Sequence, residues 1–229
     1  MSAEAFGGFP AGTFTFLRGI AAHNDKAWFQ EHRADHDEFY VGAALRFVES
    51  IGPRLRAISR SLKFEARVNG SLFRIQRDVR FSKDKSPYKT HLDLWFWAGE
   101  RRGWDSPGCF FRMFHDRLII GAGMHQFEKA QLAAYREAAL DGKRGRALVE
   151  ALDQVRRAGP YTIGGATRKS VPRGFDGGHE RAPLLLHEGL FATLEARASK
   201  QARTPGFVDY CLGHLAAMWP VARWIQSAL

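Results

Sequence analysis

Cysteine is scarce in this sequence, and acidic residues are few relative to basic ones. Among 229 residues there are two cysteines, Cys109 and Cys211, which lie far apart in the chain. Two cysteines exclude a disulfide scaffold, and without a C-x-x-C pair the usual zinc and redox sites are excluded too. A compact chain of this length buries roughly 70–75% of its unfolded surface, so it needs no cross-links. We therefore expect both thiols to be buried and reduced.

Long apolar runs are also missing. The longest segments without a charged residue, Ala5 to Leu17 and Tyr210 to Ala222, contain 13 residues each, whereas a membrane-spanning helix needs about 20. The chain opens with Met-Ser-Ala-Glu, which lacks the basic region of a secretory signal. These features predict no membrane contact and a cytoplasmic location.

The apolar residues that are present follow helical spacing, then strand alternation, then helical spacing again. Helices are expected at 13–23, after Asn24-Asp25, at 36–51, 54–62, 127–140, 144–157 and 205–227, and strands at 71–81, 92–98, 109–115 and 118–122. Residues 159–181 read as a loop with a short strand, and Asp116-Arg117 as a hairpin turn. This order predicts a single α+β domain over residues 1–229. Its central, mostly antiparallel sheet would cover about residues 71–122, packed by the N-terminal and C-terminal helices.

Aromatic side chains gather on these expected strands. They are Trp95, Trp97, Trp104, Phe96, Phe110 and Phe111. Most of them should lie in the core, and an outward-facing ring could stack on a base.

Positive charge is concentrated in one short segment. The chain has a net charge of +10, and residues 60–89 supply +6 of it through nine basic and three acidic side chains. Because the excess is local, its field should be local as well.

The segment FRIQRDVRFSKDKSPYKT, residues 73–90, contains the centre of this charge. As a strand, residues 72–81 would place Arg77 on an otherwise apolar face between Ile75 and Val79. A charge there needs a partner, and two partners are possible: a carboxylate from elsewhere in the chain or an anionic ligand.

The remaining basic side chains of this segment should project from a loop over Ser82–Thr90, which Pro87 keeps from being helical. Arginine forks and lysine ammonium groups together suit phosphate, and Tyr88 could stack on a base or close a pocket. Arg173, in the Gly-rich VPRGFDGGH segment at 171–179, could complete the site. The predicted anion-binding residues are Arg74, Arg77, Arg80, Lys83, Lys85, Tyr88, Lys89 and Arg173.

These residues also carry a resemblance. The central segment resembles the signature of an uncharacterised family, domain of unknown function 2461, and NDKAWFQEHR from residue 24, GAG at 121–123 and VPRGFDGGH at 171–179 agree with it. The resemblance implies one whole-length domain of bacterial or fungal type, and it supplies no catalytic residues.

Histidines provide weaker candidates for chemistry. His32 and His36 are four residues apart with Asp35 between them, as in some zinc helices, but their neighbours are so polar that a solvated face is the preferred interpretation. No metal site is predicted. His91, His115 and His125 lie in or near strands and are candidate general bases.

Together the patterns favour a basic site that binds or processes a phosphorylated small molecule or nucleotide. The alternatives are a nucleic-acid-binding module and a structural protein with an acidic partner. Whether the protein is an enzyme, which cofactor it uses and how many copies associate are left open by the sequence.

Overall fold

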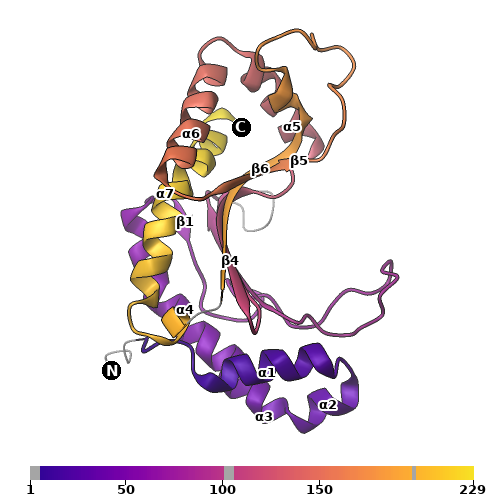
Figure 1. Ribbon diagram of the computed structural model, residues 1–229, viewed down its shortest axis with the longest axis vertical. Coiled ribbons are helices and arrows are strands. Elements are labelled where there is room, and N and C mark those ends of the chain that lie inside the picture. The colour runs from indigo at the N-terminus through magenta and orange to yellow at the C-terminus, as the bar shows by residue number, and fades with distance from the viewer. Residues whose placement is uncertain (1–5, 101–105, 198–199) are drawn as a thin grey trace. The chain divides into compact units, whose positions relative to one another are not determined.

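The computed structural model describes residues 6–100, 106–197 and 200–229. A run of helices precedes the first run of strands, further helices follow it, and the sheet is antiparallel, which confirms the α+β fold class (Figure 1). The elements are α1 (Ala11–Ala22), α2 (Lys26–Glu31), α3 (Arg33–Asp35), the π-helix η1 (His36–Gly42), α4 (Ala43–Ile51), the 3-10 helix η2 (Gly52–Ala57), β1 (Leu62–Lys63), β2 (Leu92–Ala98), β3 (Gly108–Met113), β4 (Arg117–Met124), α5 (Lys129–Leu140), α6 (Arg144–Ala158), β5 (Thr162–Ala166), the 3-10 helix η3 (Ala182–Leu186), β6 (His187–Arg197), the 3-10 helix η4 (Lys200–Arg203) and α7 (Phe207–Ala228).

The chain divides into two compact units, each made from three separate stretches. Unit 1 comprises Met1–Phe96, Phe110–Ile120 and Glu195–Leu212, and unit 2 comprises Trp97–Cys109, Gly121–Leu194 and Gly213–Leu229. The single domain expected over residues 1–229 stays a prediction.

The antiparallel sheet has six strands in the order β1-β2-β3-β4-β6-β5. The strands expected at 92–98, 109–115 and 118–122 are present as β2, β3 and β4, and the turn between β3 and β4 lies at His115–Asp116, one residue earlier than predicted. Beyond the expected region, β6 continues the sheet and pairs with β5, where Thr162 lies opposite Thr193. The pairing is irregular between Gly164 and Ala166, and Gly165 has a φ of 102° that favours glycine.

The prediction of a strand at 71–81 is wrong. Apart from isolated bridges at Leu72 and Gln76, this segment has no regular strand. Its side chains do alternate in burial, with Ile75 buried and Arg74 and Gln76 exposed. Only its first residues bond to β2, where Phe73 N–H donates to the Asp93 carbonyl and Trp95 N–H to the Ser71 carbonyl; farther along, Arg77 N–H donates to Pro87 of the loop itself, so no continuous ladder forms.

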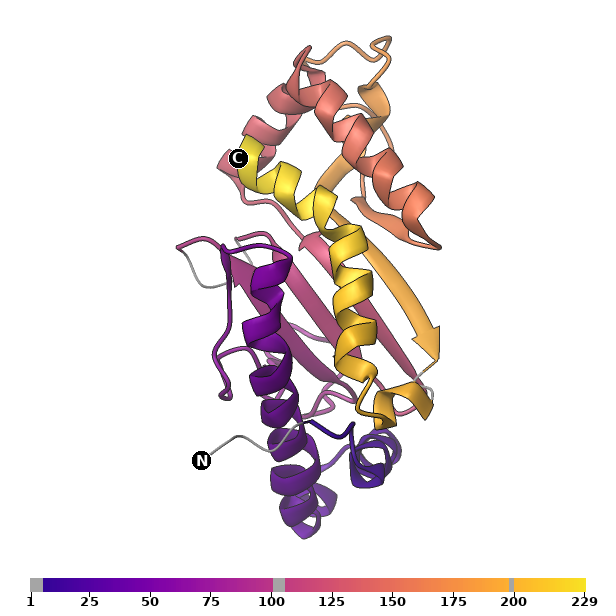
Figure 2. The same cartoon turned by 90° about the vertical axis from the view of Figure 1, so that its left-hand side faces the viewer.

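The core of unit 1 is a group of phenylalanines that joins helices to the sheet. Phe47 of α4 lies 5.4 Å from Phe111 of β3, 5.6 Å from Phe207 of α7 and 5.3 Å from Phe9, measured between ring centroids. Figure 2 shows α4 and the first turns of α7 in front of the strands. The expected core positions Trp95, Phe96, Trp97 and Phe111 are buried; Trp104 lies outside the described residues.

Of the N-terminal helices, α2 begins where the sequence indicates, whereas α1 begins at Ala11, two residues before the expected start. Asp25 caps α2 by accepting the N–H of Trp28 at 2.9 Å, as its position before the helical spacing predicted. The helix expected over 36–51 is divided, because residues 36–42 are π-helical before α4 begins.

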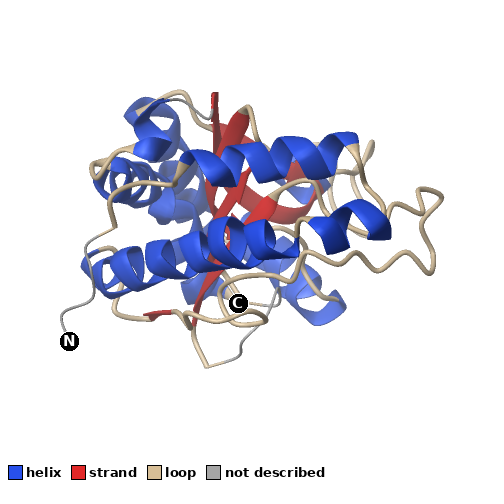
Figure 3. Cartoon of the chain, turned by 90° about the horizontal axis from the view of Figure 1, so that it is seen from below, coloured by secondary structure: helices blue, strands red, loops and turns tan. Residues whose placement is uncertain are grey.

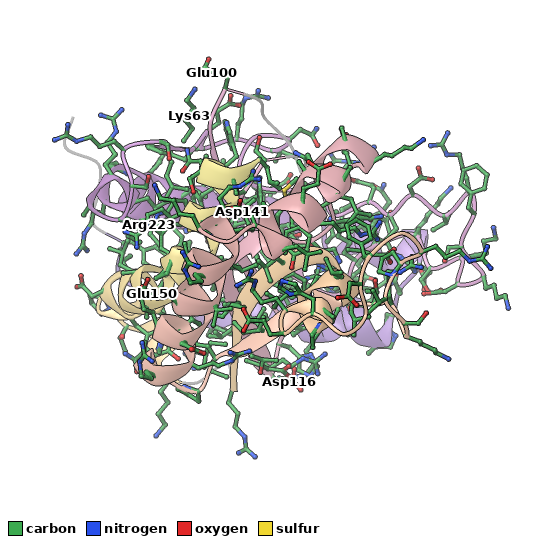
Figure 4. The ribbon with its side chains drawn as sticks, turned by 90° about the horizontal axis from the view of Figure 1, so that it is seen from above. Lys63, Glu100, Asp116, Asp141, Glu150 and Arg223 are labelled. Carbon is green, nitrogen blue, oxygen red and sulfur yellow. The ribbon has the colours of Figure 1, made fainter. Side chains whose placement is uncertain are left out.

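Unit 2 is stabilised at the ends of its helices. Asp141, labelled in Figure 4, accepts the N–H groups of Lys143 and Arg144 at 3.0 and 2.7 Å where α6 begins. The side chain of Arg181 reaches the other side of the same turn and donates to the carbonyls of Ala139 and Leu140, both at 3.0 Å. Gly145 makes room for it, since a Cβ there would lie 2.7 Å from Arg181 Nε. Within the described ranges, no helix is both long and apolar enough to cross a membrane.

Candidate functional site

The basic loop, residues 73–90, is held at its base by a short antiparallel pairing. Arg77 N–H donates to the Pro87 carbonyl at 2.9 Å, and Lys89 N–H donates to the Ile75 carbonyl at 2.8 Å. Asn24 binds the returning arm through both backbone groups of Tyr88, at 2.9 and 3.0 Å. The loop has neither helix nor regular strand, as Figure 3 shows in tan, yet its two arms are fixed to each other and to the residue before the α2 cap.

Arg77 holds the tip of the loop together. Its Nη1 donates to Asp84 at 2.5 Å and to the Ser86 carbonyl at 3.0 Å, and Nη2 donates to Ser82 Oγ at 3.4 Å. Of the two partners that the sequence allowed, the structure therefore places a carboxylate beside Arg77, and this carboxylate comes from the loop itself. The Arg77 side chain is 26% exposed, so it is partly covered rather than in the middle of an apolar face.

The other basic side chains of the tip are exposed. Arg80 pairs with Asp78 at 2.7 Å, and Lys85 Nζ donates to the Val79 carbonyl at 2.9 Å. Lys83 and Arg74 form no hydrogen bond or ion pair with a described residue. These cations do not converge on a single point, but they lie on or beside the tip of the loop, residues 78–86.

Both tip carboxylates stay ionised at neutral pH. Hydrogen bonds from Arg80 lower the pKa of Asp78 to about 2, and hydrogen bonds from Ser86 and then Arg77 lower the pKa of Asp84 to about 2. Residues 74–85 therefore contain five cations and two anions, a net charge of +3.

Phe81 is the unexpected feature of the tip. The strand prediction placed it on the apolar face with Ile75, but it is 95% exposed. The Arg80 guanidinium lies 5.8 Å from its ring centroid, and the tip extends away from the strands of unit 1 (Figure 1). A single exposed apolar ring is common on protein surfaces, but its place beside cations at the end of a loop makes Phe81 a candidate contact for a ligand.

Tyr88, by contrast, is buried. Its ring stacks on Phe29 of α2 with centroids 4.3 Å apart and an interplanar angle of 17°. The ring fastens the loop to the helix and leaves almost no surface for a base, which corrects the stacking role considered for Tyr88.

Lys89 belongs to a second group of charges, which we call the Asp93 cluster: Lys89, His91, Asp93 and Arg112. Asp93 Oδ1 accepts from Arg112 Nε at 2.6 Å. Asp93 Oδ2 lies 3.2 Å from Arg112 Nη2, 3.1 Å from His91 Nε2 and 3.4 Å from Lys89 Nζ. The Asp93 carboxylate on β2 thus contacts three side chains that can carry positive charge.

The electrostatics of the cluster keep Asp93 ionised. Burial by itself would raise the pKa of Asp93, but the hydrogen bonds from His91 and Arg112 outweigh it and hold the pKa well below its usual range. The backbone of His91 is fixed as well, because the hydroxyl of the buried Tyr40 donates to its carbonyl at 3.2 Å. Burial, and next the charge of Asp93, raise the pKa of Tyr40 far above its ordinary value.

Sequence reasoning missed Asp93 and Arg112. The signal was present, because each is a single charge inside an apolar strand: L-D-L-W-F-W for Asp93 and C-F-F-R-M for Arg112. Opposite charges on two strands joined by the same meander should be tested as a cross-strand pair.

Arg173 stays untested as a site residue. It is exposed in a loop of unit 2, whereas the basic loop belongs to unit 1.

His32 and His36, the pair with the zinc-helix spacing, pack on aromatic rings, whereas His115 and His125 stay untested as general bases. His32 stacks on Trp28 at 4.0 Å, and His36 packs on Phe29 at 5.0 Å, so both rings contact aromatic side chains. In the described part of the chain, no three His, Cys, Asp or Glu side chains form a group that could hold a metal ion.

Comparison with known proteins identifies a family whose description names no activity. The family model described as "Conserved hypothetical protein (DUF2461)" matches residues 12–224. A search of curated proteins found no match.

Proposed function

The chain belongs to the DUF2461 family of conserved hypothetical proteins, and on this premise we propose that it binds single-stranded nucleic acid through the tip of the basic loop. The observation that carries the proposal is Phe81, 95% exposed beside a set of cations. Phosphates would lie against the cations and a base would stack on the Phe81 ring.

The chemistry of single strands supports this choice. Proteins bind them through basic surfaces that follow the phosphates and aromatic rings that stack on the bases. Arg74, Arg80, Lys83 and Lys85 supply the exposed cations, and a duplex would hide the faces of its bases from Phe81.

The pocket interpretation, a cleft for a small phosphorylated ligand, has less support at the loop. It needed Arg77 to be held for a ligand, but Asp84, Ser86 and Ser82 occupy its guanidinium. Arg77 instead keeps the tip in shape, so that a bound strand would meet a surface that is already ordered.

The test is the anisotropy of a fluorescein-labelled 20-nucleotide oligothymidylate, measured with the full chain at two salt concentrations. Phe81→Ala should weaken binding about 5- to 100-fold, the range for one stacked base, and Phe81→Trp should restore it. Lys83→Gln should reduce the slope of log affinity against log salt by about 0.7, the value for one phosphate contact with a single strand.

Two exposed side chains of unit 2, one on α6 and one on the residue just before it, provide matched controls. Val149→Ala removes a partly exposed apolar group and Lys143→Gln removes an exposed charge, both in unit 2. Neither should change binding. No binding at low salt, or equal affinity of Phe81→Ala and the wild type, refutes the proposal. Phe81-dependent sedimentation with phosphatidylserine vesicles, without oligonucleotide binding, would assign the tip to membranes instead.

A further inference from the structure

We infer that the Asp93 cluster is a second anion site, separate from the loop tip, which takes a single phosphate group such as that of a small phosphomonoester. The inference rests on the arrangement of Lys89, His91, Asp93 and Arg112 and uses none of the tip residues.

The four side chains of the Asp93 cluster differ in how far they are exposed to solvent. The Asp93 side chain is 8% exposed, His91 18%, Lys89 22% and Arg112 40%. The carboxylate is therefore the most covered member, and the groups that can carry positive charge are nearer to solvent. An anion that approaches from solvent meets N–H donors before it meets Asp93.

The cluster also has more positive charge than its carboxylate needs. Arg112 binds both oxygens of Asp93, and this bidentate pair alone neutralises it. Lys89 then leaves a charge of +1, which becomes +2 when His91 is protonated. A groove of about 580 Å³ along α6 contrasts with this, because its charged lining is balanced: Arg146, Arg157 and Arg181 against Glu150, Asp153 and Glu180.

Donors remain available on these cations. A guanidinium has five N–H groups and an ammonium has three, whereas the contacts to Asp93 use two on Arg112 and one on Lys89. His91 Nδ1 forms no hydrogen bond with any described residue. These groups match the several acceptor oxygens of a phosphate.

The donors are also held in place before a ligand arrives. Lys89 Nζ lies 5.1 Å from the centroid of the Phe73 ring, and the His91 ring packs on Phe114 at 5.1 Å. The Arg117 guanidinium also contacts Phe114, 4.2 Å from the ring centroid. Fixed donors lose little entropy on binding, which favours a small ligand with few contacts.

The experiment is a titration of the full-length protein with inorganic phosphate at constant ionic strength, followed by the NMR signal of Arg112 Nε–H. A saturable shift is expected. Arg112→Gln, followed through the His91 ring signals, should weaken phosphate binding about tenfold or more, the effect of losing a hydrogen bond to a charged group. Lys89→Gln is the second variant, because its 3.4 Å contact to Asp93 is the longest in the cluster and its loss should spare the fold.

Lys83→Gln distinguishes this site from the loop tip. It should weaken oligothymidylate binding and leave phosphate binding unchanged, and Lys89→Gln should do the reverse. A shift that is linear in phosphate, or a saturable shift that Lys89→Gln leaves unaltered, means an adventitious ion only and overturns the inference. If phosphate binds and the oligonucleotide does not, this site stands and the proposed function falls.

Discussion

Asp93 bonds to three side chains at once. A buried carboxylate is stable only when it is paired, and this one is paired with Arg112, His91 and Lys89 together. The same pairing that stabilises the strand also fixes the donors of the proposed phosphate site. Structure and binding at this position therefore depend on one residue.

Replacing this carboxylate should be costly. Asp93→Asn removes the charge that balances Arg112, and we expect the free energy of unfolding to fall by about 3 kcal/mol, at the low end for a broken buried pair because Arg112 is 40% exposed. Urea denaturation at pH 7 measures it. Asp78→Asn, which removes one member of an exposed ion pair, is the control and should leave stability nearly unchanged.

The same variant makes a prediction about pH. The folded-state pKa of Asp93 is lowered, so its stabilisation is complete above the unfolded pKa of about 3.9 and is lost as the pH falls below it. The difference in unfolding free energy between wild type and Asp93→Asn should therefore shrink from pH 5 to pH 2. A constant difference over this range would show that the charge of Asp93 does not stabilise the fold.

At the scale of elements, sequence patterns succeeded where local periodicity and burial agreed. β2, β3 and β4 follow directly from their apolar, aromatic runs, and Asp25 marks the start of α2. β6 was missed because HEGLFATLEAR mixes helix-forming Leu, Ala, Glu and Arg, and its strand conformation depends on pairing with β4 and β5. For residues 71–81 a strand was predicted but not formed. Alternating polar and apolar residues do not make a strand unless a neighbouring strand pairs along the whole segment, and here β2 pairs only near Leu72.

For the candidate site, too, some features were predictable from the sequence and others were not. The charge of the basic loop and the loop conformation of residues 82–90 were predicted from the sequence, whereas residues 71–81 were wrongly expected to form a strand. The partner of Arg77 and the exposure of Phe81 were not predictable, since they depend on how residues 78–86 turn back on themselves.

The C-terminus of α5 provides a prediction at this scale. Arg181→Leu leaves the carbonyls of Ala139 and Leu140 without their donor inside unit 2, and unpaired buried acceptors cost about 1–3 kcal/mol each. We expect a loss of about 2–4 kcal/mol and faster amide hydrogen exchange in the last turn of α5. Arg156→Leu on α6, an exposed member of an i,i+3 pair, should be nearly neutral; equal losses for the two variants would contradict the capping role.

At the scale of the whole molecule, the division of the chain into two units has a consequence for unfolding. Each compact unit is assembled from three stretches, so neither can be excised as one continuous segment. The prediction of a single domain then becomes a prediction about unfolding.

We expect one cooperative thermal transition. Far-UV circular dichroism, which reports on the helices of both units, and tryptophan fluorescence should give the same midpoint within error. Phe47→Ala, at the centre of the unit 1 core, should lower both midpoints together, with a loss of about 3–5 kcal/mol. Two separate midpoints, or a variant that shifts only one signal, would mean that the units unfold independently.

The two buried cysteines have a practical consequence for chemistry at the surface. Burial raises the pKa of both Cys109 and Cys211 well above the ordinary thiol value, and nucleophilic thiolate is scarce at both. A cysteine introduced at Ser82, next to Phe81, would then react first with a maleimide dye. The two native thiols therefore need not be removed before labelling, and a fluorophore on the loop tip can report directly on a ligand that binds there.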